Sequence, residues 1–475
     1  MSIPILEVQI DQDANLVVLS QERDVIEALT APGNAFTDAV VMSHGWNNDI
    51  DEARTLYRDF FGSLERVSPA AAGTTLAAGI FWPSKKFAEA DLIPGGAASA
   101  DDPVADRVLL DRLQEMKHLF GDSQADETLE RMKALIAGLG AAPNQQNQFV
   151  SLLGAILDRH TDPAQCSEDE GTVTIGDRAR NNGGAKVLKS FGLPITPKAK
   201  PGGGGAAGVG GFAGVGGFAG VGGSAGGGGF AGGGGFAGGG GFAGNPALHP
   251  GGAAAAAGLG DFFSGIKAGA LRLLNLATYS VMKDRAGKIG RDAVNPLLAR
   301  IQAAVSQTLK FHLVGHSFGG RLVTAAVDGP NALHVQTLLL LQAAYSHNGL
   351  ALNFEANQNG FFHAVLDNHK VAGPILITHS KNDRAVGLAY PLASRLNGDD
   401  AAGIGDANDR FGGMGANGAQ HVDKAEIPLL PVGGKYDFTT PGKRVFNLNG
   451  DAIIQSHGDV ARPETAAVLA AAMTL

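Results

Sequence analysis

The chain has 475 residues, 44% of them hydrophobic, which is long enough for a large core and for more than one domain. The formal net charge of −9, spread over both signs, argues against a basic surface for nucleic acid. Cys166 is the only cysteine, so an intramolecular disulfide is excluded and a zinc-thiolate site lacks ligands.

The N-terminal residues show no basic segment followed by an apolar one, as a secretory signal would. No stretch reaches the roughly 18 consecutive apolar residues of a membrane span. We therefore expect a cytoplasmic protein without a transmembrane segment. Export by a route that needs no signal peptide is the alternative.

The first part of the chain alternates strand and helix. A short strand and turn are expected in residues 5–19, and apolar runs predict buried strands at residues 38–46 and 75–82. Between these runs, residues 49–67 carry apolar side chains at helical spacing. Strand, helix and strand in this order are typical of a parallel sheet.

The pattern changes after residue 84. Residues 85–200 carry charged amphipathic helices, clearest at 106–113, 129–139 and 149–157, and predict a helical insertion or cap. Residues 201–260 are rich in Gly and Ala, with phenylalanines at intervals of six or twelve. We expect this segment to be disordered, because ordering so much glycine costs more free energy than a few phenyl rings return. Weak self-association through the Gly/Phe repeat is the alternative.

Residues 261–475 return to alternating elements. Helical periodicity runs over residues 271–307, with a break expected at Pro296, and Lys283-Asp284-Arg285 is expected to form a solvated face. Further buried strands are predicted at 310–314, 334–345, 372–378 and 444–448, and a helix at 463–473. Residues 1–84 and 261–475 together predict one α/β domain with a mostly parallel sheet flanked by helices.

One motif stands at a strand end in this domain. Gly315-His316-Ser317-Phe318-Gly319 follows the apolar run 310–314 and precedes a helix-compatible stretch. A sharp strand-to-helix turn exposes a serine hydroxyl so that a base can reach it. Gly315 and Gly319 permit the tight turn and close packing. Ser317 is therefore the candidate nucleophile.

An acid and a base follow later strands. Asp383 lies just beyond the strand at 372–378, and His457 lies between the last strand and the final helix. Because parallel strands end at one edge of a sheet, both are expected near Ser317. Asp406 and Asp409 are weaker rivals for the acid in a Gly-rich loop. The other histidines after strands, His347 and His379, fit the base less well.

The loop after the strand at 38–46 is His44-Gly45-Trp46. An acyl-transfer site needs two N–H donors for the oxyanion of its tetrahedral intermediate. We expect these to be the backbone amides of Trp46 and Phe318. His44 and Gly45 are expected to support this loop, with His44 forming a hydrogen bond rather than transferring protons.

Together these motifs resemble the α/β-hydrolase superfamily, and Gly315 to Gly320 resembles its lipase and esterase members. The resemblance covers residues 36–83 and 270–475 but not the insertion, which precedes the nucleophile strand where most lids of the family follow a later one. It implies a serine hydrolase that cleaves a small-molecule or lipid ester through an acyl-enzyme, with no metal or cofactor. Thioester or amide substrates are not excluded by the fold.

Two other functions fit the same sequence. The chain could be a non-catalytic α/β-hydrolase-like binding protein whose insertion serves as an interaction module. It could also be an exported lipase-type effector, in which the Gly-rich segment serves targeting.

Overall fold

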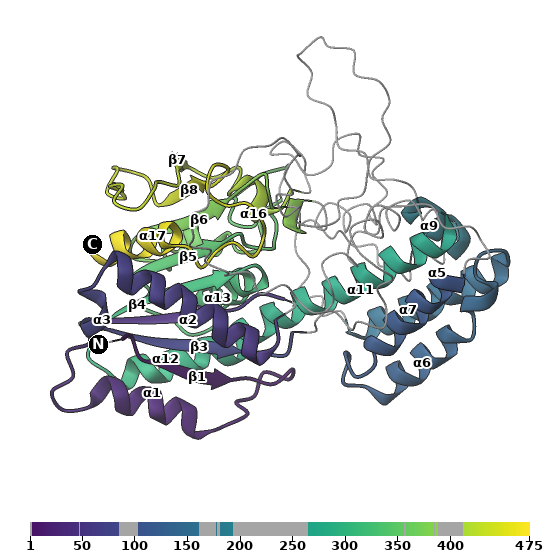
Figure 1. The fold of residues 1–475 in the computed structure, drawn as a ribbon, viewed down its shortest axis with the longest axis horizontal. Helices are drawn as coiled ribbons and strands as arrows, with labels where there is room; N and C mark the ends of the chain where they lie inside the picture. Colours follow the sequence, from purple (N-terminus) through teal and green to yellow (C-terminus); the bar gives the residue numbers. More distant parts are fainter. Residues whose placement is uncertain are drawn as a thin grey trace, which may run out of the picture.

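A computed structural model gives the fold and describes residues 2–46, 48–84, 103–160, 177, 181–192, 265–355, 358–383, 385–387 and 412–475. Within these residues an eight-stranded sheet has the order β1-β3-β2-β4-β5-β6-β8-β7, and each neighbouring pair is parallel. Helices lie on both faces (Figure 1). The predicted class, a mostly parallel sheet flanked by helices, is therefore confirmed.

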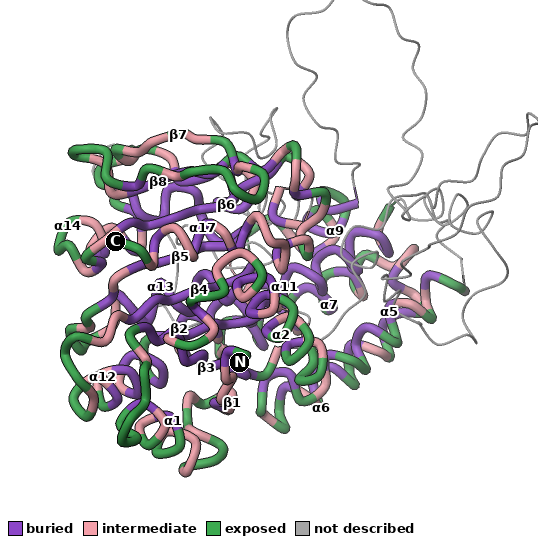
Figure 2. Tube along the Cα trace, turned by 60° about the vertical axis from the view of Figure 1, so that its left-hand side comes forward, coloured by how far each residue is buried: buried purple, intermediate pink, exposed green. Residues whose placement is uncertain are grey.

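The strands are β1 (Ile5–Gln9), β2 (Asp38–Ser43), β3 (Thr75–Phe81), β4 (Lys310–His316), β5 (Thr337–Leu341), β6 (Ile375–His379), β7 (Lys424–Pro428) and β8 (Val445–Asn449). The central strands are buried along their length (Figure 2). Side chains alternate between two cores, so that Val41 faces one and Val40 the other. Burial on both faces explains why these strands appear in the sequence as continuous apolar runs.

Helices α1 (Ser20–Thr30), α12 (Asn295–Ala304) and α13 (Phe318–Asp328) cover one face of the sheet, and α2 (Ile50–Val67) and α17 (Pro463–Met473) cover the other. Helix α2 begins at a capping box, in which Asp49 and Glu52 satisfy each other's backbone N–H groups. Short helical turns complete this part: α3 (Ala71–Thr74), α14 (Ala364–Asp367) and α16 (Met414–Asn417).

A second group of helices lies beside the sheet and is connected to it by a long helix, α11 (Ile266–Ile289) (Figure 1). The group consists of α5 (Pro103–Glu115), α6 (Ser123–Lys133), the 3-10 turn η1 (Ile136–Gly138), α7 (Pro143–His160) and α9 (Gly184–Phe191). The first half of α11 packs on this group, where Lys267 pairs with Asp106 at 2.8 Å. Its second half packs on α13, where Arg321 Nε donates to Lys283 O at 3.1 Å.

This double packing corrects one prediction. Lys283 is 1% exposed and Asp284 8%, so Lys283-Asp284-Arg285 is not a solvated face. Helix α11 is covered on nearly all sides, which leaves no surface stripe for its charges. The helix gives way to a π turn, η4 (Gly290–Val294), and Pro296 lies directly after it in the first turn of α12.

Several predictions fall outside the described residues. These are the disorder and self-association proposed for residues 201–260, the parts of the predicted insertion at 85–102, 161–176, 178–180 and 193–200, which include Cys166, and the two rival acids Asp406 and Asp409.

Candidate active site

Ser317 stands at the turn between β4 and α13, with φ of 56° and ψ of −124°. A left-handed φ is strained for a residue with a Cβ and persists only where its surroundings fix it. Here the Ser317 N–H donates to Leu341 O at 3.1 Å, and the Ser317 carbonyl accepts from Gly320 N at 2.9 Å and Ala344 N at 3.0 Å. The serine is therefore held in a rigid strand-to-helix elbow.

The glycines of the motif make this turn sterically feasible. A Cβ on Gly315 would lie 2.3 Å from Gly319 O, and one on Gly319 would lie 2.2 Å from Ser43 O. Neither distance can be relieved by rotating a side chain, because the opposing atoms belong to the backbone. Both positions therefore require glycine.

Asp383 and His457 meet although 74 residues separate them. Asp383 follows β6 and is 1% exposed, and His457 follows β8. His457 Nδ1 lies 2.9 Å from Asp383 Oδ2, while Asp383 Oδ1 accepts from Val386 N at 3.0 Å. A carboxylate can only accept a hydrogen bond, so in a neutral His457 ring the proton lies on Nδ1. The other nitrogen, Nε2, is then the basic one.

The turn that carries Asp383 is fastened to the loop that leads to His457. Asn382 Nδ2 donates to Asp451 O at 3.0 Å and to Ile454 O at 2.8 Å. The Lys381 N–H donates to Asp451 Oδ1 at 2.8 Å, and Ser380 Oγ donates to Ile454 O at 3.2 Å. These bonds join the two loops into one unit, so Asp383 and His457 keep their spacing.

His457 also packs against the elbow. Its ring centroid lies 4.8 Å from that of His316, the residue before Ser317, and His316 Nε2 donates to His457 O at 3.0 Å. Burial, with a smaller effect from the nearby His457, lowers the pKa of His316 to about 3. His316 is therefore neutral near pH 7 and serves as a hydrogen-bond donor to the histidine loop.

The loop after β2 lies directly against Ser317. A Cβ on Gly45 would lie 2.5 Å from Ser317 Cβ. His44 Nδ1 donates to Gly45 O at 2.8 Å, and His44 Nε2 accepts from the Trp82 N–H at 3.2 Å. Burial lowers the pKa of His44 to about 4, so its ring is neutral. Both ring nitrogens of His44 are thus used in holding the loop.

The side chains of Trp46 and Phe318 meet beside the elbow, with ring centroids 6.0 Å apart. Tyr279, halfway along α11, contacts both, at 4.8 Å from Phe318 and 6.0 Å from Trp46. Helix α11 therefore reaches the residues whose amides are predicted to bind the oxyanion.

The other predicted histidines lie elsewhere. His379 ends β6 with Nε2 3.9 Å from Glu426 Oε2 on β7, and burial lowers its pKa. His347 Nδ1 lies 3.4 Å from Asn417 Nδ2. In the described residues, no three histidine, cysteine, aspartate or glutamate side chains gather in a way that could hold a metal ion.

Sequence reasoning missed the residues that brace this site: Tyr279, Asn382 and Asp451. The sequence gives at most a weak indication that any of these three residues contributes to the site. Asn382 adjoins the predicted acid, and Asp451 follows the last predicted strand, but their partnership depends on which two loops meet in space.

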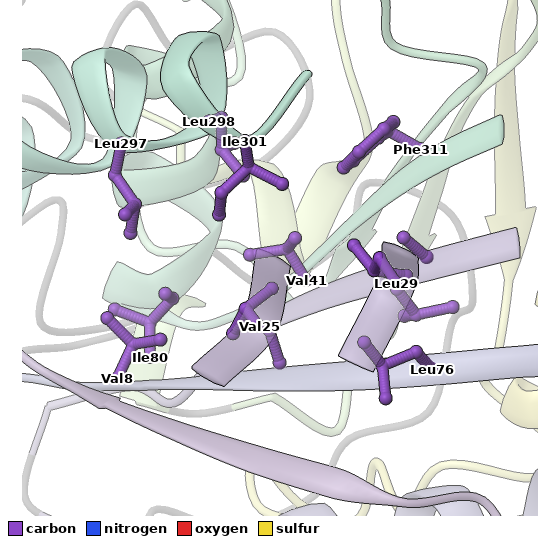
Figure 3. Close-up of a pocket in the computed structure, with 13 residues that line it drawn as sticks. Val8, Val25, Leu29, Val41, Leu76, Ile80, Leu297, Leu298, Ile301 and Phe311 are labelled. Atoms are coloured by element: carbon purple, nitrogen blue, oxygen red, sulfur yellow. The ribbon is translucent and has the colours of Figure 1, made fainter. Parts of the chain in front are cut away.

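A separate cavity is enclosed by β1, β2, β3, β4, α1 and α12 (Figure 3). Its lining is entirely aliphatic or aromatic, and its volume is about 10 Å³. That is space for one water at most, and an apolar void stays dry. It is a packing defect of the core rather than a binding site.

None of the described helices combines the length and the apolar composition that crossing a bilayer requires. No protein-family model, curated protein or solved structure matches this chain. We therefore infer function from the geometry of the site.

Proposed function

We propose that the protein is a serine hydrolase that cleaves carboxylic esters through an acyl-enzyme. The observation that carries the proposal is the 2.9 Å bond between His457 Nδ1 and Asp383 Oδ2, on a histidine that packs against the elbow of Ser317. A buried acid that orients a histidine beside a serine on a strand-to-helix turn is the arrangement that activates a hydroxyl, and Ser317 is 4% exposed.

In this mechanism Ser317 Oγ attacks the ester carbonyl while His457 Nε2 takes its proton. The backbone amides of Phe318 and Trp46 stabilise the resulting oxyanion. His457 then protonates the departing alkoxide, which leaves an ester on Ser317. A water molecule attacks this ester with His457 as base, and the acid product and the free serine are released. Asp383 keeps Nε2 directed at the reacting atoms and stabilises the imidazolium.

The strand order supports membership of the α/β-hydrolase superfamily. Ser317 follows the central strand β4, Asp383 follows β6 and His457 follows β8, so the residues occur in the order nucleophile, acid, histidine. All three stand beyond the carboxyl ends of parallel strands, where open α/β sheets place their sites. The helical group precedes β4 in the chain, and α11 connects it to the aromatic side chains beside the elbow.

A fluorophosphonate probe tests the proposal, because it reacts with activated serines and reports the modified residue by peptide mass. We expect labelling of Ser317 and its loss in Ser317→Ala. Ser63→Ala is the matched control, since Ser63 is also buried and donates to Ala461 O far from the elbow. Turnover of p-nitrophenyl acetate should fall by roughly 10⁶-fold in Ser317→Ala. A folded wild-type protein that is not labelled would instead indicate a binding protein.

A series of p-nitrophenyl esters of rising chain length then identifies the acyl group. A maximum at short chains indicates an esterase, whereas a rise in rate once a lipid interface forms indicates a lipase.

A further inference from the structure

The loop that carries His457 is held by a second side chain, Gln342. This residue comes directly after β5 and is fully buried. Its Nε2 lies 3.0 Å from Ser456 O and 3.0 Å from His457 O. Both partners are carbonyl oxygens, so the amide can only present its NH₂ group to them.

The same carbonyl receives a second donor. His316 Nε2 lies 3.0 Å from His457 O, and neutral His316 carries its proton on that nitrogen because a carbonyl can only accept. The backbone of His457 is thus held from the ends of two neighbouring strands, β4 and β5. Its ring is held from a third, β6, through Asp383.

The backbone of Gln342 is strained to reach this position. Its φ is 44°, in the left-handed region that residues with a Cβ rarely adopt. The Gln342 N–H donates to Thr378 O and Oγ1, each at 3.2 Å, and a Cβ on Gly415 would lie 2.6 Å from Gln342 C. Such conformations persist where the surroundings over-determine them, and they cluster at functional sites.

We propose that Gln342 and His316 are positioning residues, which hold the main chain of His457 so that its imidazole stays bonded to Asp383 beside the elbow of Ser317. The inference rests on the proposed hydrolase function. A bond to Asp383 fixes one ring nitrogen but leaves the ring free to follow any movement of its loop. Two donors on the His457 carbonyl prevent the loop from moving while the ring gains and loses a proton, first in acylation and then in deacylation.

Gln342→Met tests this directly, because methionine keeps the length of the side chain and removes both donors. We expect kcat for p-nitrophenyl acetate to fall roughly 10- to 100-fold with KM nearly unchanged, since the base is displaced but the substrate contacts are not. The rate of fluorophosphonate labelling should fall by the same factor.

Asn295→Leu is the matched control. Asn295 is also fully buried, and its Nδ2 donates to two carbonyls, Ala326 O at 2.8 Å and Asn331 O at 2.9 Å, at the far end of α13. It should lower the melting temperature at least as much as Gln342→Met without changing kcat of the folded protein. Equal losses of kcat in both variants would show that Gln342 matters only for stability.

A proton NMR measurement gives a readout that does not depend on turnover. The His457 Nδ1–H bound to Asp383 should give a resolved downfield resonance in wild type and in Asn295→Leu, and this resonance should broaden or vanish in Gln342→Met. If Gln342→Met does not fold, His316→Phe and His316→Gln decide, because only glutamine can restore a donor. Rescue by glutamine supports the proposal, and equal rates in the two variants overturn it.

The two proposals fail in different ways. If wild type is not labelled at Ser317, the hydrolase proposal fails, whatever Gln342 does. If wild type is labelled and Gln342→Met reacts at the wild-type rate with an unchanged resonance, the positioning role fails and the hydrolase stands.

Discussion

Gly45→Ala is the sharpest test of the geometry around the nucleophile. The added Cβ would lie 2.5 Å from Ser317 Cβ and 3.2 Å from Ser317 Oγ. Ordinary contact begins at 3.4 Å, so the loop after β2 and the elbow must separate by 3.4 − 2.5 = 0.9 Å to restore it. The Ser317 Cβ cannot rotate away, because it is fixed to a backbone held by three hydrogen bonds.

A shift of this size should lower the activity of a protein that still folds. Misplacing a reacting group by about 1 Å lowers the rate by about 10²-fold, which corresponds to about 2.7 kcal/mol in the barrier. Overpacking of this kind costs about 1–3 kcal/mol of stability, so most of the protein should remain folded at room temperature. The two effects are separated by measuring kcat/KM for p-nitrophenyl acetate alongside a urea titration.

Gly458→Ala provides the comparison. Gly458 follows His457 as Gly45 follows His44, but a Cβ there would meet nothing within 4 Å. We expect its activity to stay within about twofold of wild type, as for substitutions that touch nothing. If Gly45→Ala keeps the wild-type rate, the loop after β2 does not contribute to the reaction, and the assignment of the Trp46 amide to the oxyanion is refuted.

Three further predictions concern pH and the bracing of the site. Buried His44 and His316 have pKa values of about 4 and 3, below the ordinary 6.5 of the unfolded chain, so acid favours unfolding. Between pH 6.5 and 5 the two should together lower the free energy of unfolding by about 3 kcal/mol, measured in urea, and His316→Gln should remove about half of this dependence. Equal stability of wild type at both pH values would contradict it. Asn382→Ala removes the side-chain bonds between the loops of Asp383 and His457 and should lower kcat about 10-fold. The control is Lys381→Ala, which should change kcat little because the Lys381 side chain is 74% exposed. A wild-type kcat in Asn382→Ala would show that the loops keep their spacing without it. Asp38→Asn weakens the buried 2.9 Å pair with His312 at the opposite end of the sheet and should cost about 1–3 kcal/mol in urea unfolding. A slower labelling of the folded variant would mean that this pair also affects the site.

The buried strands could be predicted because each is a continuous apolar run at a central position of the sheet. Strand β7 could not, since Lys424-Ala-Glu-Ile-Pro is polar and proline-terminated, as befits an edge strand. The burial of Lys283 could not be foreseen either, because helical spacing does not reveal that α11 packs both on the group of α5, α7 and α9 and on α13. In the candidate site, Ser317, Asp383 and His457 stand out by residue type and position after strands. Gln342 does not, because its role depends on its left-handed backbone conformation and on its contact with the loop that carries His457. The sequence reveals neither.

The packing of α11 also determines how the protein can be divided. The helix has 24 residues and is about 36 Å long, and residues such as Leu271 and Leu274 in its first half are buried in the core that includes α5, α7 and α9. Excising the helical group would leave these leucines facing water at one end of a helix whose Tyr279 packs on Phe318, the residue after Ser317. A shortened protein of that kind should aggregate. A smaller version must therefore be redesigned along the first three turns of α11, with polar residues in place of the leucines, before the neighbouring helices are removed.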